Sequence, residues 1–579
     1  MQEVLATFSH ELAEHHPPRT VDTGFERPDS EGVPGLKLGN PEPDRWAGHR
    51  VRRIIQLPRR LTEMNLVLIE TTANQEFIFA ANKLRENVGA SELTARVGTL
   101  FVLEAVQAVG GTIPPDNSDP TSYPAISDQN PVEVILAVSG KALLLVRDAK
   151  IGRQIVHSVT LQALREAPGL DVRGVVSRDF ECETTLLHPL IGELHREFEG
   201  VRSRLPGPAA RFQRLPTIAE CASSGLPAQR VATPHDGLSK DECREYSAQT
   251  FAKLQVRKQW KNRLDSILTR HDSNANLPDA TTDLEELGCD WLAIVHADGN
   301  GLGQVFLNFD REANTTGTRD YIHKLRSFSL ALDNCTEKAF CRSLAVLRPK
   351  WNFAPIVPLV LGGDDLTVVC DGRQALQFTK KFIVCFEEET RKHPAINSIL
   401  KNGVTSSAGV AIVKPRFPFF AGYQLAKELS KSAKGLKPRS AIDYHIHYDS
   451  SGPDLEHIRR ELTIGSARLI ARPYAVRPES APPHRSWSDL QRRIDAVLAQ
   501  DEEEQRRLLP NSMLHEMRMS LYLGQDAAES QLALVRNRYS PHIDPLLVDD
   551  RLFWMEGEQH LTGLLDAVDT AEFWEALHE

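Results

Sequence analysis

The feature that most constrains the fold is an order of elements that occurs twice: strand, helix, hairpin, helix, strand. In the first copy, residues 65–70 (NLVLIE) predict a buried strand, and residues 75–89 predict a helix that ends at Gly89. A hairpin follows, in which the tripeptide SGK separates the apolar runs VEVILAV and ALLLVRD. The copy ends with an amphipathic helix over 151–169 and the strand GLDVRGVVS. This order is typical of a ferredoxin-like α+β unit.

The second copy lies at about 289–450 and repeats the same order. Its elements are the strand CDWLAIVHA, the loop GNGLG, a long helix through DYIHKLRSFSLALDNCTEKAF, and the hairpin PIVPLVLGGDDLTVVCDG. The helix ALQFTKKFIVCFEEETRKH, the strand SSAGVAIVK and the closing helix AGYQLAKELSKSAKG complete it. We therefore predict two related ferredoxin-like domains.

With 579 residues, the chain is long enough for several domains. Beyond the two copies, a connector rich in proline and polar residues and helical segments at 488–509 and 571–579 are expected. The predicted parts are an extended N-terminal region (1–60), the first domain (61–200), the connector (201–285), the second domain (286–450) and a helical C-terminal domain (451–579).

Composition restricts the cellular setting. The net charge of −10 gives no overall sign of nucleic-acid binding. The eight cysteines are scattered without a disulfide-like framework, which favours a reducing compartment. No apolar stretch approaches the roughly 20 residues of a membrane span, and the N-terminus lacks the apolar centre of a signal peptide. We expect a cytoplasmic protein without a membrane partner.

Three aspartates mark the expected site of chemistry. Asp298 ends the first strand of the second copy, and Asp364 and Asp365 lie at the tip of its hairpin. Central strands of a ferredoxin-like sheet are neighbours, so the three carboxylates should converge. Carboxylates a few Å apart require a compensating cation, and Mg²⁺ or Mn²⁺ prefers oxygen ligands. Two such ions suit phosphoryl transfer. We predict that these residues are catalytic and bind metal.

The residues around the aspartates suit a nucleotide. Glycines in the hairpin can adopt positive φ and leave room for a ligand, and those of DGNGLG open a helix whose free N–H groups can hold phosphate. A lysine at the end of the closing helix can reach a polyphosphate. Each has an ordinary alternative, because Asp and Gly are common turn residues and a C-terminal lysine interacts with the helix dipole. The predicted nucleotide contacts are Gly299, Asn300, Gly301, Gly303, Gly362, Gly363 and Lys434.

These motifs resemble a known family. HADGNGLG, LGGDDLTVVCDG, SSAGVAI, FPFFAGYQLAKELSKSAKG and SAIDYHIHY look like the second palm domain of the large subunit of type III CRISPR effector complexes, which is related to GGDEF diguanylate cyclases and polymerase palms. The resemblance extends over about 65–579, since NLVLIETTANQEFIFAANKLRENVGASELT is similar to the start of the first palm and ARPYAV to the junction with the C-terminal domain. It implies that ATP is joined through 3′–5′ linkages into cyclic oligoadenylates, with Asp298, Asp364 and Asp365 as metal ligands and the DGNGLG glycines and Lys434 near the triphosphate.

The chain departs from the family pattern in three places. The first copy has SGKA at 139–142 where an acidic pair would lie, so it should not be catalytic. HELAEHH at 10–16 lacks a His-Asp pair, so no HD nuclease is expected. Single cysteines, Cys221 and Cys243, stand where the family often has paired Cys-x-x-Cys motifs, so no zinc is expected.

The sequence therefore predicts a nucleotidyltransferase that uses two Mg²⁺ or Mn²⁺ ions to convert ATP into a cyclic or linear oligoadenylate in antiviral defence. CRISPR RNA and other effector subunits, or a second copy of the chain, are the implied partners. Two alternatives stay open: a nucleotide-binding scaffold subunit of an RNA-guided complex, and a diguanylate-cyclase-like enzyme that uses GTP.

Overall fold

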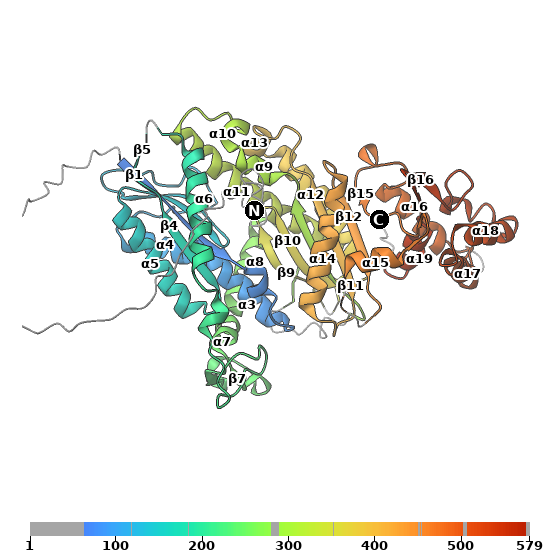
Figure 1. The fold of residues 1–579 in the computed structure, drawn as a ribbon, viewed down its shortest axis with the longest axis horizontal. Coiled ribbons are helices and arrows are strands. Elements are labelled where there is room, and N and C mark those ends of the chain that lie inside the picture. The colour runs from blue at the N-terminus through green and yellow to red at the C-terminus, as the bar shows by residue number, and fades with distance from the viewer. Residues whose placement is uncertain are drawn as a thin grey trace, which may run out of the picture.

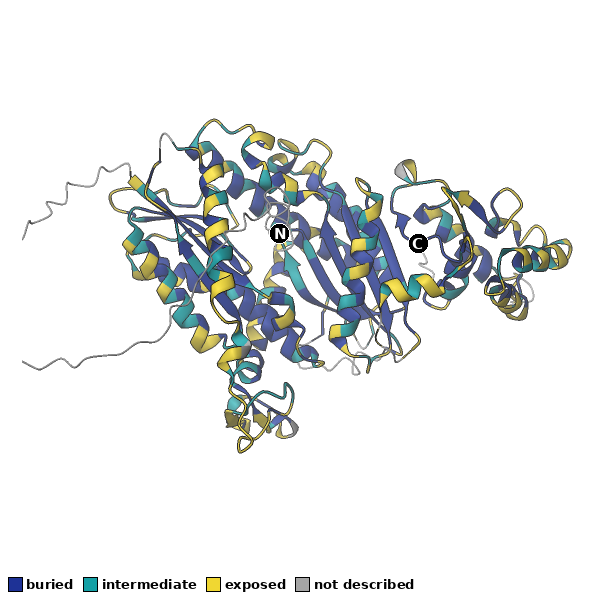
Figure 2. Cartoon of the chain, viewed as in Figure 1, coloured by how far each residue is buried: buried dark blue, intermediate teal, exposed yellow. Residues whose placement is uncertain are grey.

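The computed structural model describes residues 63–574 except Asn117, 183–184, 279–288, Trp351, 450–451, Pro453 and 502–505. The predicted N-terminal region 1–60, with its HELAEHH segment, lies outside the described residues. Figure 1 shows two sheets with helices packed on them, followed by a C-terminal part at one end of the molecule. Buried apolar side chains form one continuous core through these parts (Figure 2).

The first unit is a sheet of order β2-β3-β1-β4 with antiparallel neighbours. Helix α5 packs on one face, where Gly152 lies against Val67, and α6 covers the other face. The elements are β1 (Glu63–Thr72), α2 (Asn74–Ile78), α3 (Leu84–Arg96), a π-helical turn (Val97–Phe101), α4 (Val102–Ala108), β2 (Val132–Val138), β3 (Lys141–Val146), α5 (Ala149–Glu166), β4 (Asp171–Val176), β5 (Phe180–Glu181) and α6 (Leu187–Arg204).

The helix predicted for residues 75–89 is wrong in its bounds. The chain breaks between α2 and α3, and α3 continues through Gly89 to Arg96. A Cβ atom on Gly89 would lie 1.9 Å from the carbonyl oxygen of Lys253. This glycine therefore permits close packing against α7 (Ala248–Gln255) and does not end the helix.

The second unit repeats the arrangement of the first. Its strands β11-β8-β10-β9 have the same order as β4-β1-β3-β2, and the sheet is extended beyond β11 by β12 and β15. The elements are β8 (Leu292–Gly299), α9 (Leu302–Leu307), α10 (Phe309–Glu312), α11 (Thr318–Ser343), β9 (Ile356–Gly362), β10 (Asp365–Asp371), α12 (Ala375–Lys392), α13 (Pro394–Asn397), β11 (Ser406–Val413), α14 (Phe419–Ala433), β12 (Ala441–Ile446) and β15 (Tyr474–Ala475). The predicted α+β class with two ferredoxin-like units is confirmed.

The connector and the C-terminal part complete the described chain. The connector contains β6 (Arg230–Val231), β7 (Glu245–Tyr246), α7 and α8 (Arg257–Arg270). The C-terminal part contains α15 (Leu455–Glu461), β13 (Thr463–Ile464), β14 (Ala467–Arg468), α16 (Trp487–Leu498), α17 (Asn511–Leu521), α18 (Gln525–Tyr539), β16 (Trp554–Glu556), β17 (Gln559–Leu561) and α19 (Leu564–Ala571). None of the helices in the described part of the chain is long and apolar enough to cross a membrane.

The C-terminal part differs from its prediction in two ways. It has a small sheet of order β13-β14-β17-β16, whose strands of two or three residues are too short to show an alternating pattern. A helix was also expected at 571–579, but α19 covers Leu564–Ala571 and so ends where that helix should begin. Residues 575–579 lie outside the described residues. The helix expected at 488–509 spans Trp487–Leu498.

Candidate metal and nucleotide site

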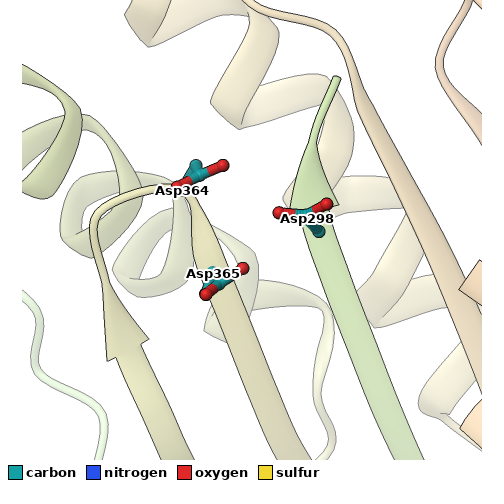
Figure 3. Close-up of side chains that lie close together, drawn as sticks. All are labelled: Asp298, Asp364 and Asp365. Atoms are coloured by element: carbon teal, nitrogen blue, oxygen red, sulfur yellow. The ribbon is translucent and has the colours of Figure 1, made fainter. Parts of the chain in front are cut away.

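The three predicted aspartates come together at one edge of the second sheet. Asp298 lies near the end of β8, Asp365 begins β10, and Asp364 lies in the turn between β9 and β10. Leu366 pairs with Ala297 in the antiparallel register, so Asp365 lies beside Asp298. One ligand oxygen from each residue lies within 4.8 Å of the others (Figure 3). The strand pairing thus brings together carboxylates that are far apart in sequence.

The chemistry of this cluster fits a divalent cation. Asp298 and Asp364 are each only 2% exposed. The Oδ1 atom of Asp298 is buried and has no hydrogen-bond partner among the described residues. Buried carboxylate oxygens normally have a partner, and three neighbouring carboxylates repel one another. An Mg²⁺ or Mn²⁺ ion would supply the missing partner and the opposite charge.

Asp365, one of the three aspartates, lines a pocket that lies between the two units. Its second-unit wall includes Gly363, Asp365 and His296, and its first-unit wall includes Ser139 and Lys141. The empty space between these walls, counted together with the solvent at its open mouth, is about 880 Å³. The site is therefore shared between two units that are separated in sequence by the connector.

Comparisons with known proteins agree with this geometry. Residues 291–443 match the family model described as Cas10/Cmr2, second palm domain. This part of the chain is similar to a Cas10-type second palm domain. A solved Csm1–Csm4 cassette in complex with cA4 has 12% identity and a TM-score of 0.50, with 88% of this chain and 70% of that chain covered. Csm1 from T.onnurineus has 13% identity and a TM-score of 0.49, with 88% and 68% covered.

No curated protein sequence matches the chain. At identities this low, the solved structures support the fold alone. The family match confirms the predicted resemblance of the second unit to the second palm domain of the large subunit of type III CRISPR complexes, and the solved structures agree in fold. The first and second units are called the first and second palm domains below.

Lys434 contacts one of the three aspartates directly. It follows the last residue of α14, and its Nζ forms an ion pair with Oδ2 of Asp298. Its side chain is 22% exposed, so the ammonium group is at the edge of the site. Lys434 thus partly neutralises the cluster in this structure, whereas the predicted contact was with a triphosphate.

The predicted glycines have different structural roles. Gly301 (φ +76°) precedes α9, and Gly363 (φ +62°) forms the hairpin turn, so both occupy the left-handed region. A Cβ atom on Gly299 would lie 2.9 Å from the Cβ of Asp364, so this position needs a glycine beside the clustered aspartates. Gly362 does not adopt the positive φ that we expected for it, and a Cβ there would lie 3.0 Å from Oδ1 of Asp333. Gly303 lies within the six-residue helix α9.

Asn300 bonds within the protein. Its Nδ2 donates to the Thr405 hydroxyl (3.1 Å) and to the Arg439 carbonyl (3.2 Å), while its Oδ1 accepts from the Ser407 hydroxyl (2.9 Å). These bonds hold the loop after β8 against the start of β11. In this structure the side chain of Asn300 therefore fixes the loop that follows Asp298, and its polar atoms bond to other parts of the protein.

Sequence reasoning missed Asp333, which lies on α11 and also lines the pocket. Burial, together with the nearby Glu337 carboxylate, raises the pKa of Asp333 to about 6. A single aspartate within an amphipathic helix has no motif around it, so only the packing of α11 against the hairpin identifies it.

The equivalent position in the first palm domain contains an ion pair. Lys141 begins β3 as Asp365 begins β10, and it pairs in register with Glu70, the counterpart of Asp298. Lys141 Nζ lies 3.6 Å from Glu70 Oε2, and both side chains are nearly buried. The first palm domain thus has an ammonium group where the second has a cluster of carboxylates.

The two cysteines of the connector have separate partners. The Cys221 thiol lies 3.5 Å from the Thr250 hydroxyl, and Cys243 donates to the carbonyl of Ser239. Burial opposes ionisation of Cys221, but hydrogen bonds with Ser224 and Thr250 outweigh it and lower its pKa to about 7. Among the described residues, the three aspartates are the group of metal-ligating side chains placed to hold an ion.

Proposed function

We propose that the second palm domain is a metal-dependent nucleotidyltransferase that joins adenylates from ATP into a cyclic or linear oligoadenylate. The observation that carries this proposal is the convergence of Asp298, Asp364 and Asp365 within 4.8 Å, with Asp365 on the wall of a pocket between the two palm domains. The family match and the resemblance of the motifs favour ATP, and the similar Csm1–Csm4 structure was solved in complex with cA4.

In this proposal the main task of the protein is to hold three carboxylates in positions where they can bind metal ions. Two Mg²⁺ or Mn²⁺ ions, when bound, would lower the pKa of an attacking 3′-hydroxyl and neutralise charge on the phosphates. Asp298 holds its carboxylate from β8, while Asp364 and Asp365 hold theirs from the hairpin. Because Asp298 and Asp365 lie on paired strands and Asp364 lies in the turn that leads into β10, their spacing is set before substrate arrives. This reduces the reorganisation needed during reaction.

Lys434 would have a second role during substrate binding. A cation at Asp298 would compete with the Lys434 ammonium group, which is already at the edge of the site. The displaced ammonium group is then available to phosphate oxygens as a point charge. This role reconciles the predicted phosphate contact with the ion pair in the structure.

We also propose a cellular role in type III CRISPR or related antiviral defence, with other effector subunits as partners. The family match to the second palm domain and the structural likeness to Csm1 support this setting. Copurification of the chain with CRISPR RNA and small protein subunits would support it, and a monodisperse protein that turns over ATP alone would favour an independent synthase.

The test of the enzymatic proposal is incubation of the purified protein with α-labelled ATP or GTP and Mn²⁺ or Mg²⁺. We expect phosphodiester products from ATP, and no product from the double variant Asp364→Ala plus Asp365→Ala. Asp290→Ala is the matched control, because Asp290 precedes β8 and its side chain is 84% exposed. Product that is undiminished in the double variant would contradict the proposal. Products from GTP alone would favour the cyclase alternative, and nucleotide binding without turnover would favour the scaffold.

A further inference from the structure

Helix α11 holds the turn of the GGDD hairpin with two side chains that lie one helical turn apart. Asp333 Oδ1 accepts a hydrogen bond from the Gly363 N–H at 2.5 Å. The Thr336 hydroxyl donates to the Gly363 carbonyl oxygen, also at 2.5 Å. Residues three apart lie on the same face of a helix, so both main-chain groups of Gly363 are bound from one side.

The same helix is fixed to the first palm domain. Arg326 lies about two helical turns before Asp333, and its guanidinium bonds to Glu133 Oε1 (3.1 Å) and to the Val134 carbonyl (2.9 Å) on β2. Arg326 and Glu133 are only 5% and 3% exposed. Breaking a buried pair of this kind is costly, so α11 has a fixed position relative to the first palm domain.

We propose that Asp333 and Thr336 are positioning residues that set the places of Asp364 and Asp365. Gly363 directly precedes both aspartates and has the left-handed backbone (φ +62°) that forms the turn. A bound N–H and a bound carbonyl leave this residue little freedom to rotate. Helix α11 therefore fixes the direction of the Asp364 and Asp365 carboxylates, and α11 is itself bonded to the first palm domain through Arg326. This inference depends on the proposed function in that the two aspartates bind a metal ion.

The first test measures Mn²⁺ binding by electron paramagnetic resonance in the full-length protein. Groups that orient metal ligands from outside typically contribute 10–100-fold to affinity, so we expect Asp333→Ala to raise the Mn²⁺ dissociation constant by about tenfold or more. Asp333→Asn keeps an oxygen that can accept the Gly363 N–H and should restore most of the affinity. Thr336→Val removes the hydroxyl at the same size and should weaken binding, whereas Thr336→Ser should not.

Asp320→Ala is the matched control. Asp320 lies on the same helix but accepts from Thr316 N and Lys324, close to the start of α11. This variant removes a carboxylate from α11 without touching the hairpin, so it should bind Mn²⁺ as the unmodified protein does. Equal Mn²⁺ affinity in the unmodified protein, Asp333→Ala and Thr336→Val would overturn the proposal.

The second test does not depend on metal binding. Hydrogen exchange of a peptide that covers residues 362–366 should be faster in Asp333→Ala and in Thr336→Val than in the unmodified protein, with an unchanged Tm. Unchanged exchange in both variants would overturn the positioning role. If the unmodified protein binds no Mn²⁺, the proposed function fails, and the exchange experiment still decides whether α11 holds the turn.

Discussion

The two palm domains have the same framework and different chemistry at the same place. Both have the strand order that puts the first strand beside the hairpin, and in both the hairpin tip lies at the end of that first strand. The second domain has Asp298 opposite Asp365, and the first has Glu70 opposite Lys141. The same fold therefore has a cluster of carboxylates with room for a metal cation in the second domain. In the first domain it has a carboxylate that is paired with a lysine side chain.

The difference extends to the wall of each site. In the second domain, His296 and Thr367 lie two residues from Asp298 and Asp365, and they line the pocket between the domains. The corresponding residues of the first domain are Leu68 and Leu143, which line a separate and mainly apolar pocket. A polar wall can orient a nucleotide, whereas an apolar wall offers it no hydrogen bonds. The comparison indicates that the hairpin alone does not make a site.

The largest expected effect comes from placing a lysine in the second domain at the position that Lys141 occupies in the first. Asp365→Lys should lower product formation by about a thousandfold or more, because metal ions supply several kcal/mol of transition-state stabilisation. The fold should persist, since the new ammonium group can pair with Asp298. Initial rates with labelled ATP and the circular dichroism spectrum measure the two effects. A rate within tenfold of the unmodified protein would show that the second domain does not need this carboxylate.

The reverse experiment removes the cation of the first domain. Lys141→Ala should destabilise the protein by about 3 kcal/mol, because it leaves the Glu70 carboxylate buried without its partner. The double variant Lys141→Met plus Glu70→Gln should recover most of this loss. Urea unfolding of both variants measures the difference. An equal loss in the single and double variants would mean that packing, and not charge, explains the effect.

A smaller change tests the space around the carboxylates. Gly299→Ala should reduce product formation by about tenfold, which corresponds to roughly 1.4 kcal/mol, because the added methyl group displaces Asp364. The corresponding residue of the first domain is Thr71, whose hydroxyl bonds to the Gly140 carbonyl. Thr71→Ala is the control and should leave product formation unchanged. Full activity in Gly299→Ala would show that the site tolerates this shift.

The smallest expected effect is a pH dependence of stability from Lys141. Burial lowers the pKa of Lys141 below its ordinary value of 10.5, although Glu70 opposes the shift. Between the lowered pKa and 10.5, the unfolded chain holds a proton that the folded chain lacks, so this group makes the protein more stable as the pH rises. Urea midpoints measured across that alkaline range should show this contribution in the unmodified protein. The double variant at Lys141 and Glu70 should lack it, and identical pH profiles would contradict the assignment.

The sequence by itself determined the order of elements and the meeting of the three aspartates. The recurring order of strands and helices predicted both ferredoxin-like units. The places of Asp298 at a strand end and of Asp364 and Asp365 at a hairpin tip predicted that the three would meet. These features depend on local pattern and on a strand order that follows from it. The bounds of α3 were not predictable, because Gly89 serves a contact with Lys253 that lies far away in the chain.

Only the tertiary structure decided which other residues belong to the site. Asp333 meets Gly363 because α11 packs against the hairpin, and Lys434 meets Asp298 because α14 ends beside β8. Glu70 and Lys141 are an ordinary strand residue and an ordinary turn residue until β1 and β3 pair. Each of these contacts is set by the packing of separate elements, and hydrophobic packing carries no local signal of which polar side chains it brings together.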